Sequence, residues 1–255
     1  MDMVFGSLSA QLFFAACAVA FFAGTVKGIV GFAMPIIMIS GMSTFLDPDL
    51  ALAGLILPTL FTNVHQAGRQ GAAVAWETTK RFRLFLIVGG IALILGAQLV
   101  AVLERNTLFI VIGGPVLLFV SLQLLGWRPQ LQRRTVGIEA GVASIAGLSG
   151  GLSGVWGPPT ILYLTALNTP KADHVRVQGV VYGLGSVLLL VAHIKSGILN
   201  LATIPFSLAL VVPAALGMML GLKIQDRFDQ ETFRTATLVV LLFAAANLLR
   251  RGLTG

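Results

Sequence analysis

The stretch GTVKGIVGFAMP, residues 24–35, decides which fold this chain can adopt. It lies in an apolar run from Leu8 to Leu46 that holds no acidic residue and one basic residue, Lys27. Glycines flank the lysine, and Pro35 closes the stretch. A charged group at the centre of a bilayer costs about 2.5–3.5 kcal/mol on insertion scales, so this ammonium group is expected to face a polar cavity or a bound anion.

The composition is that of a multi-pass membrane protein. The chain has 255 residues, of which 56% are hydrophobic and 11% are charged, and its mean hydropathy is +0.93. An ordinary soluble domain has about 25% charged residues, whereas about 20 consecutive apolar residues cross a bilayer. The net charge of +7 does not indicate a nucleic-acid partner, because the basic residues lie in short connections between apolar runs, as in cytoplasmic loops.

Eight long apolar stretches predict an all-α polytopic fold. They are apolar on all sides, as expected for helices that are buried or face lipid, and they cover residues 8–46, 50–64, 82–102, 107–125, 136–167, 173–192, 201–221 and 230–250. The first and the fifth are too long for one straight crossing and contain several glycines near their middle. We expect each of these two to be a broken helix or a re-entrant hairpin of two short helices.

The two long stretches match one another, which predicts an internal duplication. AGTVKGIVGFAMP aligns with AGLSGGLSGVWGP at a constant offset of 123 residues, and further along Gly96 resembles Gly217. Chance coincidence in a chain with 29 glycines is the alternative. We expect a first transmembrane repeat over residues 8–125, a basic cytoplasmic linker over residues 126–135 and a second repeat over residues 136–250. Each repeat would have a broken first segment followed by three transmembrane helices.

Two topologies are compatible with this duplication. If each broken segment crosses once, the repeats are parallel, with about 10 Lys and Arg on the cytoplasmic side against 5. If each is re-entrant, the repeats are inverted, with about 11 against 4, and the cytoplasmic connections are residues 65–81, 126–135, 168–176 and 222–229. The positive-inside rule separates these two poorly. We expect the inverted version, because transporters use it to form a midplane site between repeats.

The breaks have the composition of a small-anion site. Glycines let the backbone approach a ligand and free amide N–H groups, and half-helices that start near Pro35 and Pro158 would direct the positive ends of their dipoles at an anion. The candidate binding residues at the breaks are Lys27, Gly28, Gly31, Pro35, Ser149, Gly150, Gly151, Ser153, Gly154 and Pro158. The alternatives are a lysine that snorkels to the interface and glycines that serve tight helix packing.

Other polar residues in the apolar stretches are weaker candidates for lining the same cavity. Asn63 lies near the end of the second stretch, Trp156 lies beside the second break, and Gln178 and Tyr182 lie in the helix of the second repeat that matches the one holding Asn63. Hydrogen bonds between helices or anchoring at the membrane interface would explain each of them as well.

The sequence shows no constellation of reactive residues. All ten acidic residues lie outside or at the margins of the apolar stretches, so no buried carboxylate pair is available for a proton relay or a sodium site. The HExxH, Walker and GxSxG motifs are absent, as is any cluster of His and Cys with metal-ligand spacing. We expect neither an enzyme nor a protein with a metal or another cofactor.

The two breaks resemble the signatures of a known family. GTVKGIVGFAMP resembles the first-repeat signature of the sulfite exporter TauE/SafE family of bacterial permeases, and AGLSGGLSGVWGPP is similar to its second-repeat signature; the stretch RQGAAVAW at residues 69–76 adds to this. The resemblance implies a bacterial inner-membrane protein that moves small sulfur-containing anions, usually outward. The sequence departs from the commonest family pattern at two places: GFAMP in the first break, and Trp156 with a double proline in the second. These departures predict a pocket whose size and substrate differ from those of a sulfite transporter.

A secondary transporter of a small sulfur-containing anion is the leading hypothesis. Sulfite or an organosulfonate would bind near the bilayer midplane, and access would alternate between the two repeats. The alternatives are an anion channel and a permease for a small carboxylate or another anion. The expected partners are the anion and the lipid bilayer, and assembly as a homodimer is compatible with the sequence.

Overall fold

The computed structural model describes residues 3–4, 8–99, 105–127, 130–153 and 157–254, and these are almost entirely helical. Two-residue strands, β1 (Met3–Val4) and β2 (Leu8–Ser9), pair antiparallel at the N-terminal end. The helices are α1 (Ala10–Val30), α2 (Met34–Met42), α3 (Pro48–Gly68), α4 (Ala72–Arg81), α5 (Arg83–Leu99), α6 (Arg105–Leu124), α7 (Val136–Ser153), α8 (Gly157–Ala166), α9 (Lys171–Lys195), α10 (Ile204–Asp226) and α11 (Gln230–Thr254). The predicted all-α class is confirmed.

The first long apolar stretch is interrupted where its glycines and proline predict it. Helix α1 ends at Val30 and is capped by Gly31, which has a φ of 88°, and α2 begins after Ala33, which has a φ of 73°. Pro35 lies in the first turn of α2, where its missing N–H is not needed. In the second stretch, α7 is described up to Ser153 and α8 from Gly157, and residues 154–156 between them lie outside the described part of the chain. The half-helix expected near Pro35 is confirmed, and the one expected near Pro158 stays a prediction.

Five of the described helices are long and apolar enough to cross a membrane, judged by length and composition. They are α1, α3, α9, α10 and α11. Shorter apolar segments lie in α5 and α7, at Arg83–Gly96 and Val136–Gly150. This pattern is that of a multi-pass membrane protein.

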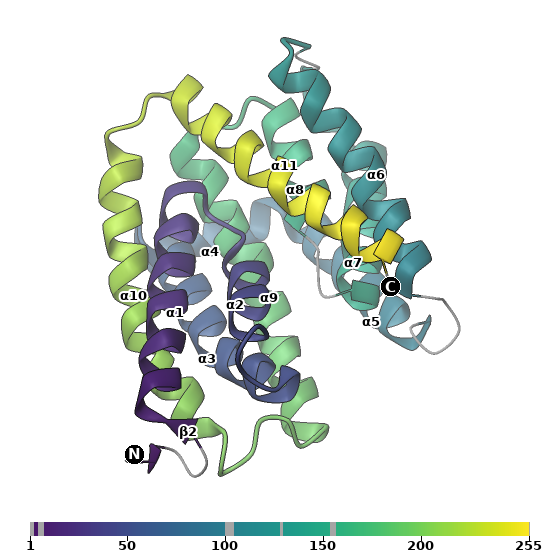
Figure 1. The fold of residues 1–255 in the computed structure, drawn as a ribbon. Helices are drawn as coiled ribbons and strands as arrows, with labels where there is room; N and C mark the ends of the chain where they lie inside the picture. The colour runs from purple at the N-terminus through teal and green to yellow at the C-terminus, as the bar shows by residue number, and fades with distance from the viewer. Residues whose placement is uncertain (1–2, 5–7, 100–104, 128–129, 154–156, 255) are drawn as a thin grey trace.

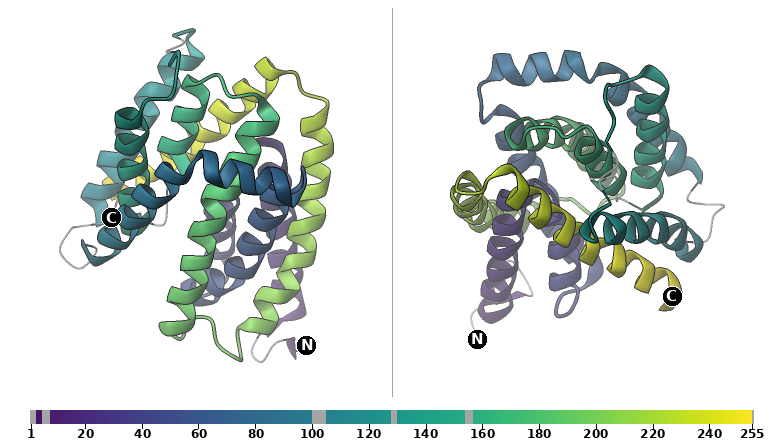
Figure 2. Two further views of the ribbon diagram at one scale, coloured as in Figure 1. Left: turned by 180° about the vertical axis from the view of Figure 1, so that it is seen from behind. Right: turned by 90° about the horizontal axis from the view of Figure 1, so that it is seen from above.

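Helix α4 lies in a segment that the sequence predicts as a connection. Its residues mix alanine and tryptophan with Glu77, Lys80 and threonines, so it lacks the continuous apolar character that marks the other helices. Seen from behind, α4 (blue) runs across the outside of α9 (green) (Figure 2). A helix that crosses another in this way extends over the surface of the bundle and does not add a further parallel span.

The helices form two groups that lie side by side (Figure 1). One group contains α1, α2, α3, α9 and α10, and the other contains α5, α6, α7 and α8; α11 (yellow) crosses from the first to the second. The most extensive contacts join α1 to α10, α5 to α7, α6 to α11 and α3 to α9. Segments from the two halves of the chain are therefore interleaved in both groups.

Glycines allow α1 and α10 to pack backbone against backbone. A Cβ added at Gly24 would lie 2.2 Å from the carbonyl oxygen of Ala214, and one at Gly28 would lie 2.3 Å from that of Met218. Both separations are too short for any side chain. Helix association in a membrane depends on such close van der Waals packing, because lipid is as apolar as the side chains it replaces.

Helices α5 and α7 also pack closely, backbone against backbone, at glycines. A Cβ added at Gly147 would lie 2.2 Å from the carbonyl oxygen of Gly89, and one at Gly96 would lie 2.7 Å from that of Leu148. Each half of the chain therefore contributes one helix to each glycine-packed pair.

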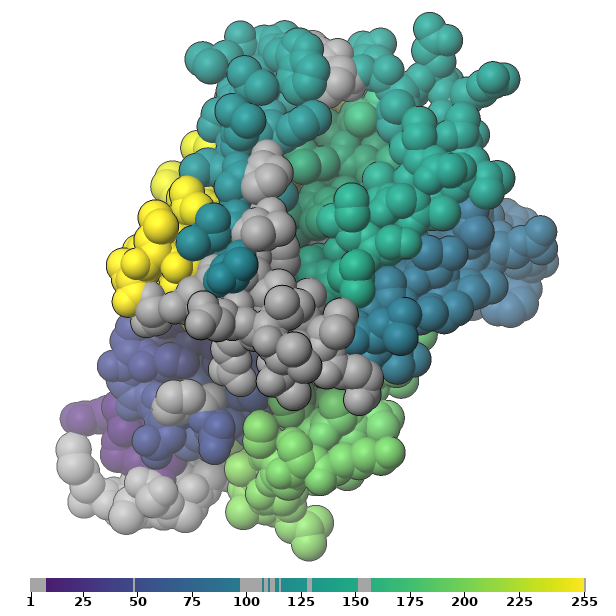
Figure 3. Space-filling model, turned by 90° about the vertical axis from the view of Figure 1, so that its right-hand side faces the viewer, coloured from purple at the N-terminus to yellow at the C-terminus, as the bar shows by residue number. Residues whose placement is uncertain are grey.

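Four connections meet at one end of the molecule: residues 65–81, 126–135, 168–176 and 222–229. Side-chain contacts link them to one another: Arg69 to Asp226 at 2.7 Å, Arg176 to Thr78 at 2.7 Å, Arg134 to the carbonyl of Arg81 at 2.8 Å and Lys171 to the carbonyl of Gln225 at 3.1 Å. In the space-filling view, the blue residues of α4 and α5 lie beside teal residues of the second half (Figure 3). Because α3 ends and α9 begins at this end, these two helices run antiparallel.

Candidate functional site

A small cavity with a few polar side chains in a mainly apolar wall lies beside the break between α1 and α2. Its volume is about 60 Å³. It is lined by residues from α1, α2, α3, α8, α9 and α11: Lys27, Phe32, Ala33, Pro35, Ile36, Thr59, Asn63, Gly157, Pro158, Tyr182 and Ala244. A space of one water-sized sphere, about 10–15 Å³, holds one water molecule, so this cavity has room for a few waters or one small anion.

Among the described residues that line the cavity, Lys27 alone carries a positive charge. Its side chain is 2% exposed, and its ammonium group donates a hydrogen bond to Oδ1 of Asn63. An ammonium group has three N–H donors, and the remaining two have no hydrogen-bond acceptor among the residues that the structure describes. The ion pairs found in the described part of the chain do not include Lys27. A buried charge without a counter-charge is costly, so an anion in the cavity would stabilise it.

Hydrogen bonds connect Lys27 to both halves of the chain. Asn63, on α3, accepts from Lys27 and donates through Nδ2 to the carbonyl of Tyr182 on α9 at 3.0 Å. The hydroxyl of Tyr182 donates in turn to the carbonyl of Gly157, at the start of α8, at 3.4 Å. The ammonium group is therefore held at a point where both broken segments approach one another.

Thr59 contributes a free hydroxyl to the same cavity. Its side chain is 2% exposed, and its Oγ1 has no hydrogen-bond partner within the described residues. Buried polar groups are rarely left without a partner. This hydroxyl is therefore suited to bind a water molecule or a ligand oxygen in the cavity.

The first turns of two half-helices border the cavity. Ala33, Pro35 and Ile36 come from the start of α2, and Gly157 and Pro158 come from the start of α8. No side chain caps the N-terminus of α2. The first N–H groups of a helix have no partner within the helix and carry a partial positive charge. The cavity thus combines an ammonium group with the positive ends of helix dipoles.

Three glutamines bind the carbonyl groups at the C-terminal end of α1. Gln66 of α3 donates to the carbonyl of Gly31 at 3.0 Å and to that of Val175 at 2.6 Å. Gln225 of α10 donates to the carbonyl of Ile29 at 2.9 Å.

Gln178 of α9 completes this set, which we name the glutamine cradle: Gln66, Gln178 and Gln225. With its amide oriented to satisfy its neighbours, Gln178 donates to the carbonyls of Val30 and Gly31, at 3.2 Å each, and accepts from His174 at 3.3 Å. Carbonyls at a helix end need such partners when they are buried. The cradle therefore fixes where α1 ends and where Lys27 lies.

The structure brings together five of the residues that the sequence nominates for binding. Those that line the cavity are Lys27, Pro35, Asn63, Pro158 and Tyr182. The remaining nominated residues that are described lie elsewhere. Gly28 packs on α10, Gly31 caps α1, Gln178 belongs to the cradle, Ser149 donates to the carbonyl of Ala146, and Gly150 is buried in α7.

Four nominated residues cannot be placed. Gly154 and Trp156 lie outside the described residues, and for Gly151 and Ser153 the structure describes the backbone of α7 alone.

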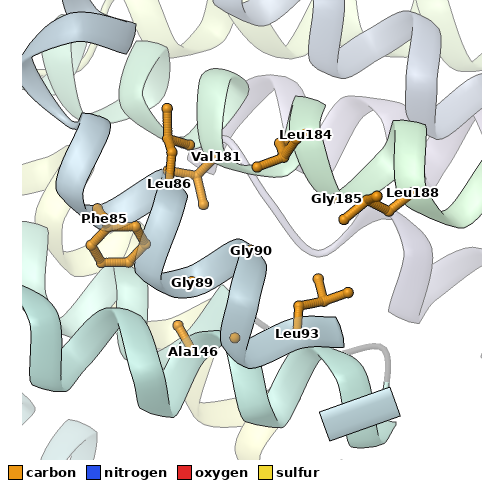
Figure 4. Close-up of a pocket in the computed structure, with 11 residues that line it drawn as sticks. Phe85, Leu86, Gly89, Gly90, Leu93, Ala146, Val181, Leu184, Gly185 and Leu188 are labelled. Carbon is orange, nitrogen blue, oxygen red and sulfur yellow. The ribbon is translucent and has the colours of Figure 1, made fainter. Parts of the chain in front are cut away.

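Two other spaces are apolar, and the larger of them adjoins this cavity. A groove of about 790 Å³ between α1, α2 and α11 shares Ala33, Ile36 and Ala244 with the cavity. A second pocket, of about 30 Å³, lies between α5, α7 and α9 and is lined by apolar side chains and glycines, including Phe85, Leu86, Leu184 and Leu188 (Figure 4). It offers no charged group to an anion, so the Lys27 cavity is the better candidate site.

Comparison with known proteins gives one match. The model of the sulfite exporter TauE/SafE family matches residues 16–248, which is nearly the whole chain. No curated protein and no solved structure matches the chain significantly. The chain therefore belongs to the sulfite exporter TauE/SafE family of membrane transport proteins, and the resemblance seen in the two breaks is confirmed.

Proposed function

We propose that this protein is a secondary transporter, of the bacterial inner membrane, for a small sulfur-containing anion that binds in the Lys27 cavity. The observation that carries the proposal is the buried ammonium group of Lys27, which has one protein hydrogen-bond acceptor and no neighbouring carboxylate among the described residues. An oxyanion would supply both the missing acceptors and the missing negative charge.

The cavity has the donors that an oxyanion such as sulfite requires. Lys27 and Thr59 offer side-chain donors, and the start of α2 offers backbone N–H groups. The volume of about 60 Å³ suits a small anion. An organosulfonate would place its sulfonate group here and its apolar part in the adjoining groove, through the residues that both spaces share.

Two inverted repeats would provide the alternating access that such a transporter needs. The antiparallel course of α3 and α9 supports this arrangement, because these helices occupy matching places after the two breaks. The basic connections that meet at one end are the four that the inverted topology assigns to the cytoplasm. We therefore retain repeats over residues 8–125 and 136–250, joined by the linker 126–135.

The contacts made by glycines also support an internal duplication of the two halves of the chain. Gly24 and Gly147 are 123 residues apart and contact Ala214 and Gly89, which are 125 residues apart. In the same way, Gly96 contacts Leu148, and Gly221 contacts Thr25. The counterpart of Gly96 by contact is thus Gly221. The sequence alignment instead suggested Gly217, four residues away on the same helix.

The membrane potential alone is sufficient to drive export. Moving one elementary charge across 100 mV is worth about 2.3 kcal/mol, and an inside-negative potential favours outward movement of an anion. Proton-coupled transport commonly uses a buried acid, and the one buried acid among the described residues, Glu139, pairs with Arg134 far along the chain from Lys27.

Flux into proteoliposomes tests the proposed function. Purified protein would be reconstituted, and uptake of labelled sulfite, thiosulfate, sulfoacetate and acetate would be measured at a set membrane potential. A carrier of sulfur anions should show saturable flux of a sulfur anion that unlabelled substrate inhibits. Flux that rises linearly with concentration would favour the anion channel, and preference for acetate would favour the carboxylate permease.

Cysteine labelling tests the inverted arrangement independently. Asp49→Cys at the start of α3 and Ala172→Cys at the start of α9 are both exposed, and Cys17→Ala removes the native thiol. A membrane-impermeant maleimide applied to intact cells should label one position and spare the other. Labelling of both from the same side would rule out inverted repeats.

A further inference from the structure

A second polar pocket lies at the basic end of the molecule, where the four connections meet. Its volume is about 220 Å³. It is lined by Thr78, Arg81, Phe82, Leu131, Gln132, Arg133, Arg134, Leu167, Thr169, Pro170, Asp173, Arg176 and Val177. It shares no lining residue with the Lys27 cavity, so its ligand is a separate question from the transported anion.

Four arginines give this arginine pocket an excess of positive charge. Arg134 pairs with Glu139 at 2.6 Å, and Arg176 pairs with Asp173 at 2.7 Å. Arg81 and Arg133 are exposed and pair with no carboxylate within the described residues. Two guanidinium groups therefore remain uncompensated at the rim of one cavity.

The two paired arginines are held in place by further contacts. The guanidinium of Arg134 lies 4.0 Å from the centre of the Phe82 ring and donates to the carbonyl of Arg81 at 2.8 Å. Arg176 donates through Nε to Thr78 at 2.7 Å. Side chains fixed in this way lose little conformational freedom when a ligand binds.

The surrounding aromatic residues indicate the depth of the pocket relative to the membrane. Trp76, on the same helix as Arg81, is 62% exposed, and Trp127, which precedes the segment holding Arg133, is 48% exposed. Exposed tryptophans are typical of the level of the lipid headgroups. A basic pocket at this level on the cytoplasmic side is suited to anionic headgroups.

We propose that the arginine pocket binds a phosphate group, carried either by an anionic phospholipid headgroup or by a soluble phosphate ester. Planar guanidinium forks match the oxygens of a phosphate and bind them in pairs. The apolar side chains of Phe82, Leu131 and Val177 would contact the part of the ligand that follows the phosphate.

Native mass spectrometry of the delipidated full-length protein tests this proposal. The first arm adds phosphatidylglycerol or cardiolipin, with phosphatidylcholine as the zwitterionic reference; the second adds inorganic phosphate or glycerol phosphate. The test variant is Arg81→Gln with Arg133→Gln, which leaves both ion pairs of the pocket intact. The matched control is Lys223→Gln with Arg227→Gln, because both residues are exposed, lie at the same end and are absent from the pocket.

We expect one phosphate source to bind the wild type and the control alike, and to bind the test variant about tenfold or more weakly. Preference for phosphatidylglycerol or cardiolipin over phosphatidylcholine would identify a headgroup as the source, and binding of the soluble phosphates would identify a soluble ligand. The proposal is overturned if neither source binds, or if the test variant and the control bind equally well. Because the Lys27 cavity is untouched by these substitutions, sulfur-anion flux should not change in either variant.

Discussion

The two sides of the break between α1 and α2 differ in whether side chains bind their free backbone groups. On the α1 side, the carbonyl groups of Ile29, Val30 and Gly31 are bound by the glutamine cradle. On the α2 side, the first N–H groups have no side-chain cap and border the cavity. On the α1 side the protein supplies hydrogen-bond donors to these three carbonyl groups, and on the α2 side the N–H groups are left for a ligand.

This difference explains how the break selects for charge. Glutamine amides neutralise the negative end of α1 without adding a charge, because they donate hydrogen bonds and remain neutral. The positive end of α2 would ordinarily take a Ser, Thr, Asp or Asn cap, and here Ala33 stands at that position. With Lys27 one helical turn before Gly31, the open side of the break is positive and suited to an anion.

A carboxylate placed on the open side should have the largest effect. Ala33→Asp would cap α2 and put a negative charge beside Lys27, so the side chain would occupy the place of the anion. We expect affinity for the transported anion to fall by more than about 100-fold, since a close buried charge pair is strongly coupled. Isothermal titration calorimetry measures this, with the uncharged Ala33→Asn as the control. Equal affinities of the two variants would mean that the anion binds elsewhere.

A side chain at the cap of α1 should be the next most damaging change. At Gly31, a Cβ would lie 1.8 Å from the side-chain amide of Gln178, and the φ of 88° disfavours any L side chain. We expect Gly31→Ala to destabilise the protein by about 2–4 kcal/mol, through backbone strain and the loss of a cradle contact. Thermal unfolding in detergent measures the change.

Gly197, just after the C-terminal end of α9, provides the matched control for Gly31. Its φ is 79°, yet no atom lies within 4 Å of an added Cβ. Gly197→Ala should therefore show the backbone strain alone, about 1–2 kcal/mol. Equal losses at the two positions would show that the contact with Gln178 contributes nothing.

Removal of single donors from the cradle should have a smaller effect. Gln66→Leu removes the donor to the carbonyls of Gly31 and Val175, and Gln225→Leu removes the donor to the carbonyl of Ile29. We expect each substitution to cost about 1–3 kcal/mol. Thermal unfolding and anion affinity would be measured together, with the exposed Gln132→Leu as the control. Because the cradle also positions Lys27, affinity should fall along with stability. Unchanged stability in both cradle variants would contradict a structural need for these hydrogen bonds.

Relief of strain on the open side should give the smallest change. Ala33 has a φ of 73°, which glycine adopts more readily. Ala33→Gly should therefore raise the stability by about 1 kcal/mol and leave anion affinity within a factor of two or three. A stability loss measured in the same unfolding experiment would show that the Ala33 methyl group packs usefully in the cavity wall.

Much of this arrangement is readable in the sequence. The glycine-proline pattern predicts both breaks and the half-helices after them, and the isolated Lys27 predicts the cavity. The cradle is not predicted, because Gln66 and Gln225 lie near helix ends where polar residues are common, and only the fold brings them to α1. Helix α4 is missed because its residues are neither apolar throughout nor typical of a turn.

Gly28 shows why sequence spacing alone does not separate a glycine that binds a ligand from one that packs against a helix. It lies next to Lys27 in sequence, which favours a place in the binding site. On a helix, however, neighbouring residues point about 100° apart, and Gly28 therefore faces α10 while Lys27 faces the cavity. The spacing of four residues between Gly24 and Gly28, repeated at Gly217 and Gly221, is the signal for helix packing.

Anion binding to Lys27→Met tests the central claim most directly. Methionine keeps the length of the side chain and removes its charge, and the exposed Lys195→Met controls for the loss of one positive charge elsewhere. Calorimetric titration with sulfite and thiosulfate should show binding to the wild type and Lys195→Met, and at least about 100-fold weaker binding to Lys27→Met. The unfolding temperature of Lys27→Met should be equal to or above that of the wild type, because an uncompensated buried charge has been removed. Undiminished binding of the anion to a well-folded Lys27→Met would contradict the assignment of this cavity as the transport site.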